Sequence, residues 1–352
     1  MFQTIFEKFS GFLDQRFILS VWIPSLFFWA ALLGLALGWA GPSVMLAWWK
    51  QYPTELQVAL AVLLFAWITF FARLLLSVLG SLTRIYEGYW NHLLLIEKLP
   101  LLGDFGNRRR RYYACKIASL KKGKENAEIY QRFPPVTRLD AVMPTRMGNI
   151  LKNGELYPKL LYGMNAVLVW PRLYSVLPDA MVTNFGSAAA ELELMLVISV
   201  LGAAFACVGG LMAVALLPCW VAPACILGGA LVAWLGYEGA VRSALSYNML
   251  VKAAFDLHRG TLLKTIGWFP ATSYAKEKAQ WGRISQLWFQ NPPPTSAHAL
   301  PLGYEQEKHE EPAKAAEDSV GYLWIKNGGE ELRGGCLITT IPKSETGTQD
   351  GG

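Results

Sequence analysis

Residues 194–217, LMLVISVLGAAFACVGGLMAVALL, decide the fold class of this chain. The stretch contains no charged side chain. As an α-helix it would be about 36 Å long, enough to cross the roughly 30 Å hydrocarbon core of a bilayer. The stretch therefore predicts a membrane-spanning helix.

Three further stretches have the same apolar character, and together with 194–217 they predict two transmembrane hairpins. The first stretch is too long for a cleaved signal peptide and lacks the basic flank of one. The loop of the second hairpin is very short, and the loop of the first carries aromatic residues typical of membrane interfaces. The three stretches are 17–39, 56–80 and 222–241.

The composition of the whole chain agrees with this class. Of the 352 residues, 53% are hydrophobic and only 16% are charged, whereas an ordinary soluble domain carries about 25% charged residues. The net charge of +6 indicates the positive-inside rule and attraction to anionic lipid rather than binding of nucleic acid. The five cysteines form no CxxC pair and the four histidines do not cluster, so no disulfide framework, metal site or cofactor is predicted.

The segment between the two hairpins is strongly basic. Residues 81–188 contain 16 Lys or Arg and 8 Asp or Glu, with apolar residues interleaved, which predicts a packed α-rich domain. Both predicted outer loops together carry one basic residue, Lys50. The distribution of Lys and Arg therefore places the basic domain and both termini in the cytoplasm, at a bacterial inner membrane.

The predicted fold is an all-α membrane protein with four transmembrane helices, two of which extend into the cytoplasm. The second is expected to continue toward Pro100, and the fourth to end at Arg259 with Gly260 as its C-cap. A further helix is expected within 262–290, and 320–341 is typical of a weak β-hairpin in a small tail. The predicted segments are an amphipathic interfacial helix 1–16, hairpin 17–80, basic domain 81–189, hairpin 190–241, helical extension 242–290 and flexible tail 291–352.

Four charged residues lie at a similar depth near the cytoplasmic ends of the predicted spans. Arg73 is the deepest, roughly 10 Å below that end, Glu238 lies one turn inside the fourth span, and Glu191 and Glu193 mark the start of the third. A charge within a membrane is costly and usually faces a partner or a wet cavity. One hypothesis pairs Arg73 with Glu238 or Glu193. The other has Arg73 reaching out to lipid headgroups, with the glutamates marking the interface.

A basic patch and a set of small residues suggest two kinds of surface. The patch would bind anionic lipid or a phosphorylated ligand, or be a solvated face that sets topology; stacking platforms for nucleic acid are not evident. Glycines and alanines at four-residue spacing, such as Gly34 with Gly38 and Gly202 with Ala206, indicate close helix packing within the chain or in a homo-oligomer. The patch comprises Arg108, Arg109, Arg110, Arg111, Lys116, Lys121, Lys122 and Lys124.

Three short motifs each place an arginine among turn-forming or aromatic residues: MPTRMGN (143–149), VWPRL (169–173) and FDLHR (255–259). With the four-span layout over about residues 15–290, they resemble a bacterial four-helix inner-membrane protein family without a known activity. The resemblance implies a fold and no mechanism. The arginines Arg146, Arg172 and Arg259 either fasten the cytoplasmic domain to the helix extensions, through Asp140, Glu155 or Asp256, or form a ligand site.

Catalytic signatures such as a phosphate-binding loop, a nucleophile elbow or a zinc-protease helix are not found, so no catalytic residue and no enzyme is predicted. The first interpretation is a membrane-anchored interaction, signalling or scaffold protein, whose basic domain and tail recruit a cytoplasmic protein partner. The alternative is an oligomeric ion channel or membrane-permeabilising effector with a basic vestibule.

Overall fold

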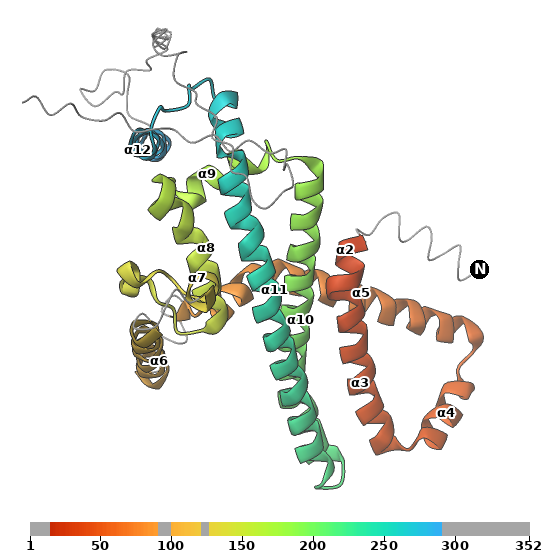
Figure 1. The fold of residues 1–352 in the computed structure, drawn as a ribbon. Coiled ribbons are helices and arrows are strands. Elements are labelled where there is room, and N and C mark those ends of the chain that lie inside the picture. Colours follow the sequence, from red (N-terminus) through yellow and green to blue (C-terminus); the bar gives the residue numbers. More distant parts are fainter. Residues whose placement is uncertain (1–14, 91–99, 121–126, 291–352) are drawn as a thin grey trace, which may run out of the picture. The chain divides into compact units, whose positions relative to one another are not determined.

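A computed structural model describes residues 15–90, 100–120 and 127–290 of the chain (Figure 1). Every regular element within these ranges is a helix. Several predictions lie outside the described residues and stay predictions. They are residues 1–14 of the predicted interfacial helix 1–16, the patch residues Lys121, Lys122 and Lys124, and the tail 291–352 with its hairpin.

Four helical segments are long and apolar enough to cross a membrane, by length and composition. The first, Ile18–Ala40, begins as the π-helix η1 (Ile18–Trp22), which follows α2 (Gln15–Phe17), and continues as α3 (Ile23–Ala40). The others are α5 (Thr54–Glu87), α10 (Asp179–Leu216) and α11 (Val221–Thr265), and the short α4 (Pro42–Gln51) joins α3 to α5. To within one residue at either end, these segments contain the four predicted apolar stretches.

Helices α10 and α11 lie side by side along their length (Figure 1), and glycines hold them in backbone contact. A Cβ atom on Gly202 would lie 2.6 Å from the backbone nitrogen of Ala233, and one on Gly229 equally close to that of Ala206. Such small residues let two helix axes approach closely. We call this line of contact the α10–α11 seam. By contrast, a Cβ on Gly34 would meet nothing within 4 Å, so not every predicted small-residue pair packs within the chain.

The helix ends differ from the predicted ones at three places. Helix α5 ends at Glu87, well before Pro100, because Gly88 adopts a left-handed conformation with φ of 97°. Helix α10 begins at Asp179, directly after Pro178, and not at the predicted Leu194. The prediction missed this first part because residues 179–193 are too polar to extend the apolar stretch. Helix α11 continues through Gly260 and ends at Thr265, so Gly260 is not its C-cap.

Shorter helices surround the extension of α11 beyond its apolar half. They are α8 (Arg146–Tyr162), α9 (Ala166–Tyr174) and α12 (Tyr274–Gln290). Their shared core contains Val169, Leu173, Phe255 and Trp281, all fully buried. The remaining described elements are α6 (Pro100–Leu120), α7 (Ala127–Arg132) and the 3-10 helix η3 (Val136–Ala141). The extension of α11 is therefore the central element of this helical domain.

Candidate functional site

The motif 143–149 forms a junction between the end of α5 and the start of α8. The hydroxyl of Thr145 accepts a hydrogen bond from the backbone nitrogen of Gly148 at 2.9 Å, which caps α8, and donates to the carbonyl of Glu87 at 2.9 Å. The side chain of Asn149 accepts from the nitrogen of Met143 at 2.8 Å and donates to its carbonyl at 2.9 Å. We call this arrangement the junction; its buried polar groups are satisfied within the motif itself.

Glycine is required at two positions of the junction for different reasons. A Cβ atom on Gly148 would lie 2.0 Å from the carbonyl oxygen of Glu87. A Cβ on Gly88, which already has a positive φ, would lie 2.4 Å from Cγ of Pro144. The first turn of α8 therefore rests directly on the backbone that ends α5.

Two ion pairs connect the ends of the apolar stretches to other elements. Nη1 of Arg146 in the junction lies 2.5 Å from Oε1 of Glu238 on α11. Nη2 of Arg16, at the start of the first span, lies 2.5 Å from Oε1 of Glu193 on α10. The junction is therefore tied to α11 as well as to α5.

The hypothesis that Arg73 pairs with Glu238 or Glu193 is wrong. Both carboxylates form ion pairs with other arginines, Glu193 with Arg16 and Glu238 with Arg146. The guanidinium of Arg73 instead lies 3.9 Å from the ring centroid of Phe17, a cation–π contact. Glu191 lies exposed on α10.

Exchanging the charges of the Arg146–Glu238 pair tests its contribution. Both side chains are partly exposed, at 38% and 23%, so we expect Arg146→Glu or Glu238→Arg alone to lower the free energy of unfolding by about 1–2 kcal/mol. The double exchange should recover most of that loss. Denaturation in mild detergent measures it. Additive losses in the double variant would show that the two residues do not interact.

The arginines of the other two motifs contact α12. Nε of Arg259 lies 2.8 Å from Oε1 of Glu277, and the guanidinium of Arg172 lies 4.1 Å from the ring centroid of Trp288. The motif arginines thus fasten helices to one another, but not through the carboxylates that we expected; Arg259 donates to the backbone carbonyl of Asp256, not to its carboxylate. Asp140 pairs with Arg138, Glu155 pairs with Lys152, and the Asp256 carboxylate accepts hydrogen bonds from Tyr157 and Tyr162.

A buried lysine that we did not predict as a site residue contacts the end of α7. Lys252 of α11 is 2% exposed, and its Nζ donates to the carbonyl of Tyr130 at 2.8 Å and lies 4.0 Å from that ring's centroid. The Asn153 side chain donates to the carbonyls of Tyr130 and Phe133. The last carbonyls of a helix lack partners within it and carry its negative dipole end, so donors and cations suit them. We call Asn153 and Lys252 the carbonyl clamp.

Lys252 lies on the part of α11 that extends beyond a span. A span that starts with α11 needs about 20 residues and so ends near Val241, and Lys252 follows about 16 Å further along the helix. Burial lowers the pKa of Lys252 to about 8, against the opposing effect of Asp256. One signal for this residue existed in the sequence: Asn248 and Lys252 place two polar side chains four residues apart on an otherwise apolar helix face.

Two adjoining cavities lie beside the junction. One, of about 390 Å³, is lined by charged residues that include Glu87, Lys152, Glu155 and Glu193. The other, of about 310 Å³, is mostly apolar, and the two share Leu151, Glu155 and Tyr247 in their linings. Within the described ranges, no group of three His, Cys, Asp or Glu side chains is arranged to hold a metal ion.

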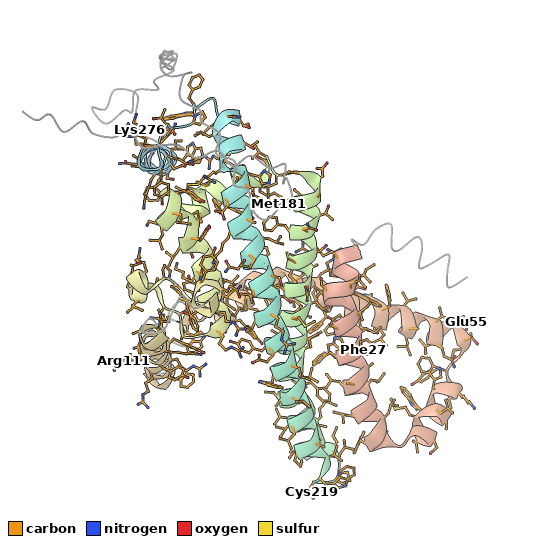
Figure 2. The ribbon with its side chains drawn as sticks, in the orientation of Figure 1. Phe27, Glu55, Arg111, Met181, Cys219 and Lys276 are labelled. Atoms are coloured by element: carbon orange, nitrogen blue, oxygen red, sulfur yellow. The ribbon has the colours of Figure 1, made fainter. Side chains whose placement is uncertain are left out.

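The described part of the basic patch contains exposed residues, engaged residues and Arg110, which is half-buried and whose Nε has no hydrogen-bond acceptor within the described ranges. Arg108 and Arg111 are exposed on α6, and Figure 2 shows the Arg111 side chain extending outward from that helix. Nη2 of Arg109 lies 3.2 Å from the hydroxyl of Tyr113. Lys116 is engaged too, with its Nζ 5.7 Å from the ring centroid of Phe133. Of the five patch residues that the structure describes, Arg108 and Arg111 are therefore the exposed ones.

Comparisons with known proteins provide no relative. No family model, curated protein or solved structure matches this chain. The function is therefore inferred from the junction, the carbonyl clamp and the exposed surfaces alone.

Proposed function

We propose that this chain is an integral membrane protein that anchors a basic helical domain at the cytoplasmic face of a bacterial inner membrane, as a scaffold for a protein partner. One observation carries the proposal: α11 is a single helix of 45 residues, about 67 Å long. Its first half is apolar enough to span a bilayer, and its second half supplies Phe255, Leu262 and Leu263 to the core of the helical domain. A domain built around an extended span is held at a fixed distance from the bilayer.

The contacts beyond the spans support a stiff anchor. The junction ties α8 to α5 and α11, and Arg259 with Glu277 ties α12 to α11. Arg108 and Arg111, exposed on α6, are the surface that we assign to an acidic partner. Their charge also fits the positive-inside rule, which favours a cytoplasmic location for this domain and for both termini.

Two features favour an anchor over an oligomeric channel. The α10–α11 seam is closed by backbone contact, which leaves no path for ions between these two helices. The glutamates at the ends of the spans, Glu193 and Glu238, are each neutralised by an arginine of the same chain. Selectivity filters instead present charges or carbonyls to the pore.

Native cysteines on two elements test the proposed topology. Cys115 is exposed on α6, and Cys219 is exposed at the turn that joins α10 to α11 (Figure 2). In single-cysteine variants, we expect a membrane-impermeant maleimide to label Cys219 in intact spheroplasts, and Cys115 only in inverted vesicles. Cys207, exposed on the apolar part of α10, is the control and should react from neither side, because it faces lipid.

Two results would contradict the proposal. The first is labelling of Cys115 and Cys219 from the same side of the membrane. The second is selective ion flux through liposomes that hold the correctly oriented protein, if the flux changes in the Glu238→Gln variant. That result would favour the channel.

A further inference from the structure

The cytoplasmic half of α5 carries a polar stripe on the side that faces away from the rest of the chain. Its members follow one another at intervals of three or four residues, apart from one adjacent pair, and are all exposed, whereas Ala72, Leu75 and Leu79 on the opposite side are buried. Residues at this spacing lie on one helix face. The stripe consists of Arg73, Ser77, Gly80, Ser81 and Arg84.

The two arginines of the stripe stand outside the ion pairs of the described part of the chain. Among the described residues, neither Arg73 nor Arg84 forms an ion pair; Arg84 has only a Coulombic interaction with Glu87. One face of the Arg73 guanidinium is covered by the buried ring of Phe17 at 3.9 Å. That contact holds the cation in place and leaves its N–H donors without an acceptor among the residues that the structure describes.

An apolar ridge runs directly beside the polar stripe on the same exposed side of α5. Phe70 is 61% exposed, Leu74 52% and Val78 41%, and the spacing of four residues aligns them along the helix axis. The stripe extends about 16 Å from Arg73 to Arg84, more than the roughly 5–8 Å headgroup layer on each side of a bilayer. One helix face thus offers cations at headgroup depth and an adjacent surface for an acyl chain.

We infer that this face of α5 is a binding site for one anionic phospholipid, with Arg73 and Ser77 holding the phosphate, Arg84 attracting it at longer range, and the Phe70–Val78 ridge contacting an acyl chain. The inference rests on the proposed insertion of α5 into a membrane. Guanidinium groups bind phosphate oxygens through paired charge-assisted hydrogen bonds, and a serine hydroxyl supplies a further donor. Glycine at position 80, in open space, leaves the stripe uncovered at its centre.

A second copy of the chain fits this face less well than a lipid does. Two arginines would need two carboxylates on the facing helix. At a similar depth on the described spans, Glu193 and Glu238 are already paired, which leaves the exposed Glu191 and the half-buried Glu87. Because Glu87 already interacts with Arg84 of its own chain, a second copy offers one exposed carboxylate for two arginines, whereas an anionic headgroup layer offers phosphates in excess.

Native mass spectrometry of the detergent-solubilised protein, titrated with phosphatidylglycerol, measures the Kd of the first bound lipid. One arginine near an anionic lipid surface contributes about a fivefold change in affinity. We therefore expect the Kd to rise about fivefold in Arg73→Gln and about twenty-fivefold in Arg73→Gln with Arg84→Gln. Arg73→Lys, which keeps the charge, should lose less than Arg73→Gln. The matched control is Arg132→Gln with Arg283→Gln, which removes two exposed arginines from α7 and α12 and should leave the Kd unchanged.

Three outcomes would overturn the site. An unchanged Kd in the double α5 variant would show that the stripe does not bind lipid. Equal competition by soluble glycerol phosphate would indicate a general anion site without a role for the apolar ridge. A change in the mass distribution between monomer and oligomer, with no change in Kd, would assign the stripe to a second copy. Because the titration is done in detergent, its result is independent of the cysteine labelling that tests membrane topology.

Discussion

Replacing Gly148 with alanine is expected to lower the free energy of unfolding by about 3 kcal/mol, the upper part of the range for overpacked sites. The new Cβ atom would lie 2.0 Å from the carbonyl oxygen of Glu87 and 2.8 Å from the hydroxyl of Thr145. The carbonyl belongs to the backbone at the end of α5 and cannot rotate away as a side chain would. The start of α8 must move, which breaks the N-cap and the hydrogen bond to Glu87. Unfolding by denaturant in mild detergent measures the loss.

Gly186→Ala is the matched control for Gly148→Ala. Gly186 lies within α10, and a Cβ there would meet nothing within 4 Å. Alanine favours a helix by about 0.5–1 kcal/mol over glycine, so this variant should be as stable as the parent or slightly more stable. Equal stability of the two variants would mean that α8 and α5 are not in the contact described.

The second large effect is a dependence of stability on pH through Lys252. The pKa of the buried amine is about 8, against an ordinary value of 10.5. Between these two values the unfolded chain binds a proton at this residue that the folded chain does not bind. Linkage then requires the free energy of unfolding to rise with pH, by roughly 2.5 kcal/mol from pH 7 to pH 10. Below pH 8 the folded protein bears the cost of a buried charge.

Subtracting a Lys252→Met variant isolates this contribution. Methionine keeps an unbranched apolar side chain of similar length and cannot titrate, so the difference in stability between parent and variant should change by about 2.5 kcal/mol over the same range. The comparison ends at pH 10 because burial and Asp256 raise the pKa of Tyr162 to about 12. Ionisation of this tyrosine in the unfolded chain then lowers stability. A constant difference from pH 7 to pH 10 would show that Lys252 is not buried as described.

The apolar helices could be predicted from the sequence because their signal is local. A long run without charge, such as 194–217, is sufficient to indicate a helix able to span a membrane. The helix ends were less predictable, since residues 179–193 are too polar to extend the apolar run, although Pro178 marks the true start of α10. A helix end could thus be predicted only where the composition of the sequence changes abruptly.

The contacts of charged residues could not be predicted, because they depend on the path of the chain between elements. Arg73 and Glu238 were predicted at matching depths. The ion pair of Glu238 is nevertheless with Arg146, which is distant in sequence from both. Lys252 lies on an apolar helix face and contacts the end of α7. This helix has six residues, too few to be predicted from the sequence. In the motif 143–149, the need for glycine at 148 became visible only with Glu87 beside it.

The length of α11 has a mechanical consequence if its first half is embedded as proposed. Helix and seam together form a stiff lever whose outer arm, residues 242–265, is about 36 Å long. A change in bilayer thickness alters the tilt of a span, and ten degrees of tilt would displace the far end of such an arm by about 6 Å. The thickness of the membrane would then be converted into a change in position of the surface that meets a cytoplasmic partner.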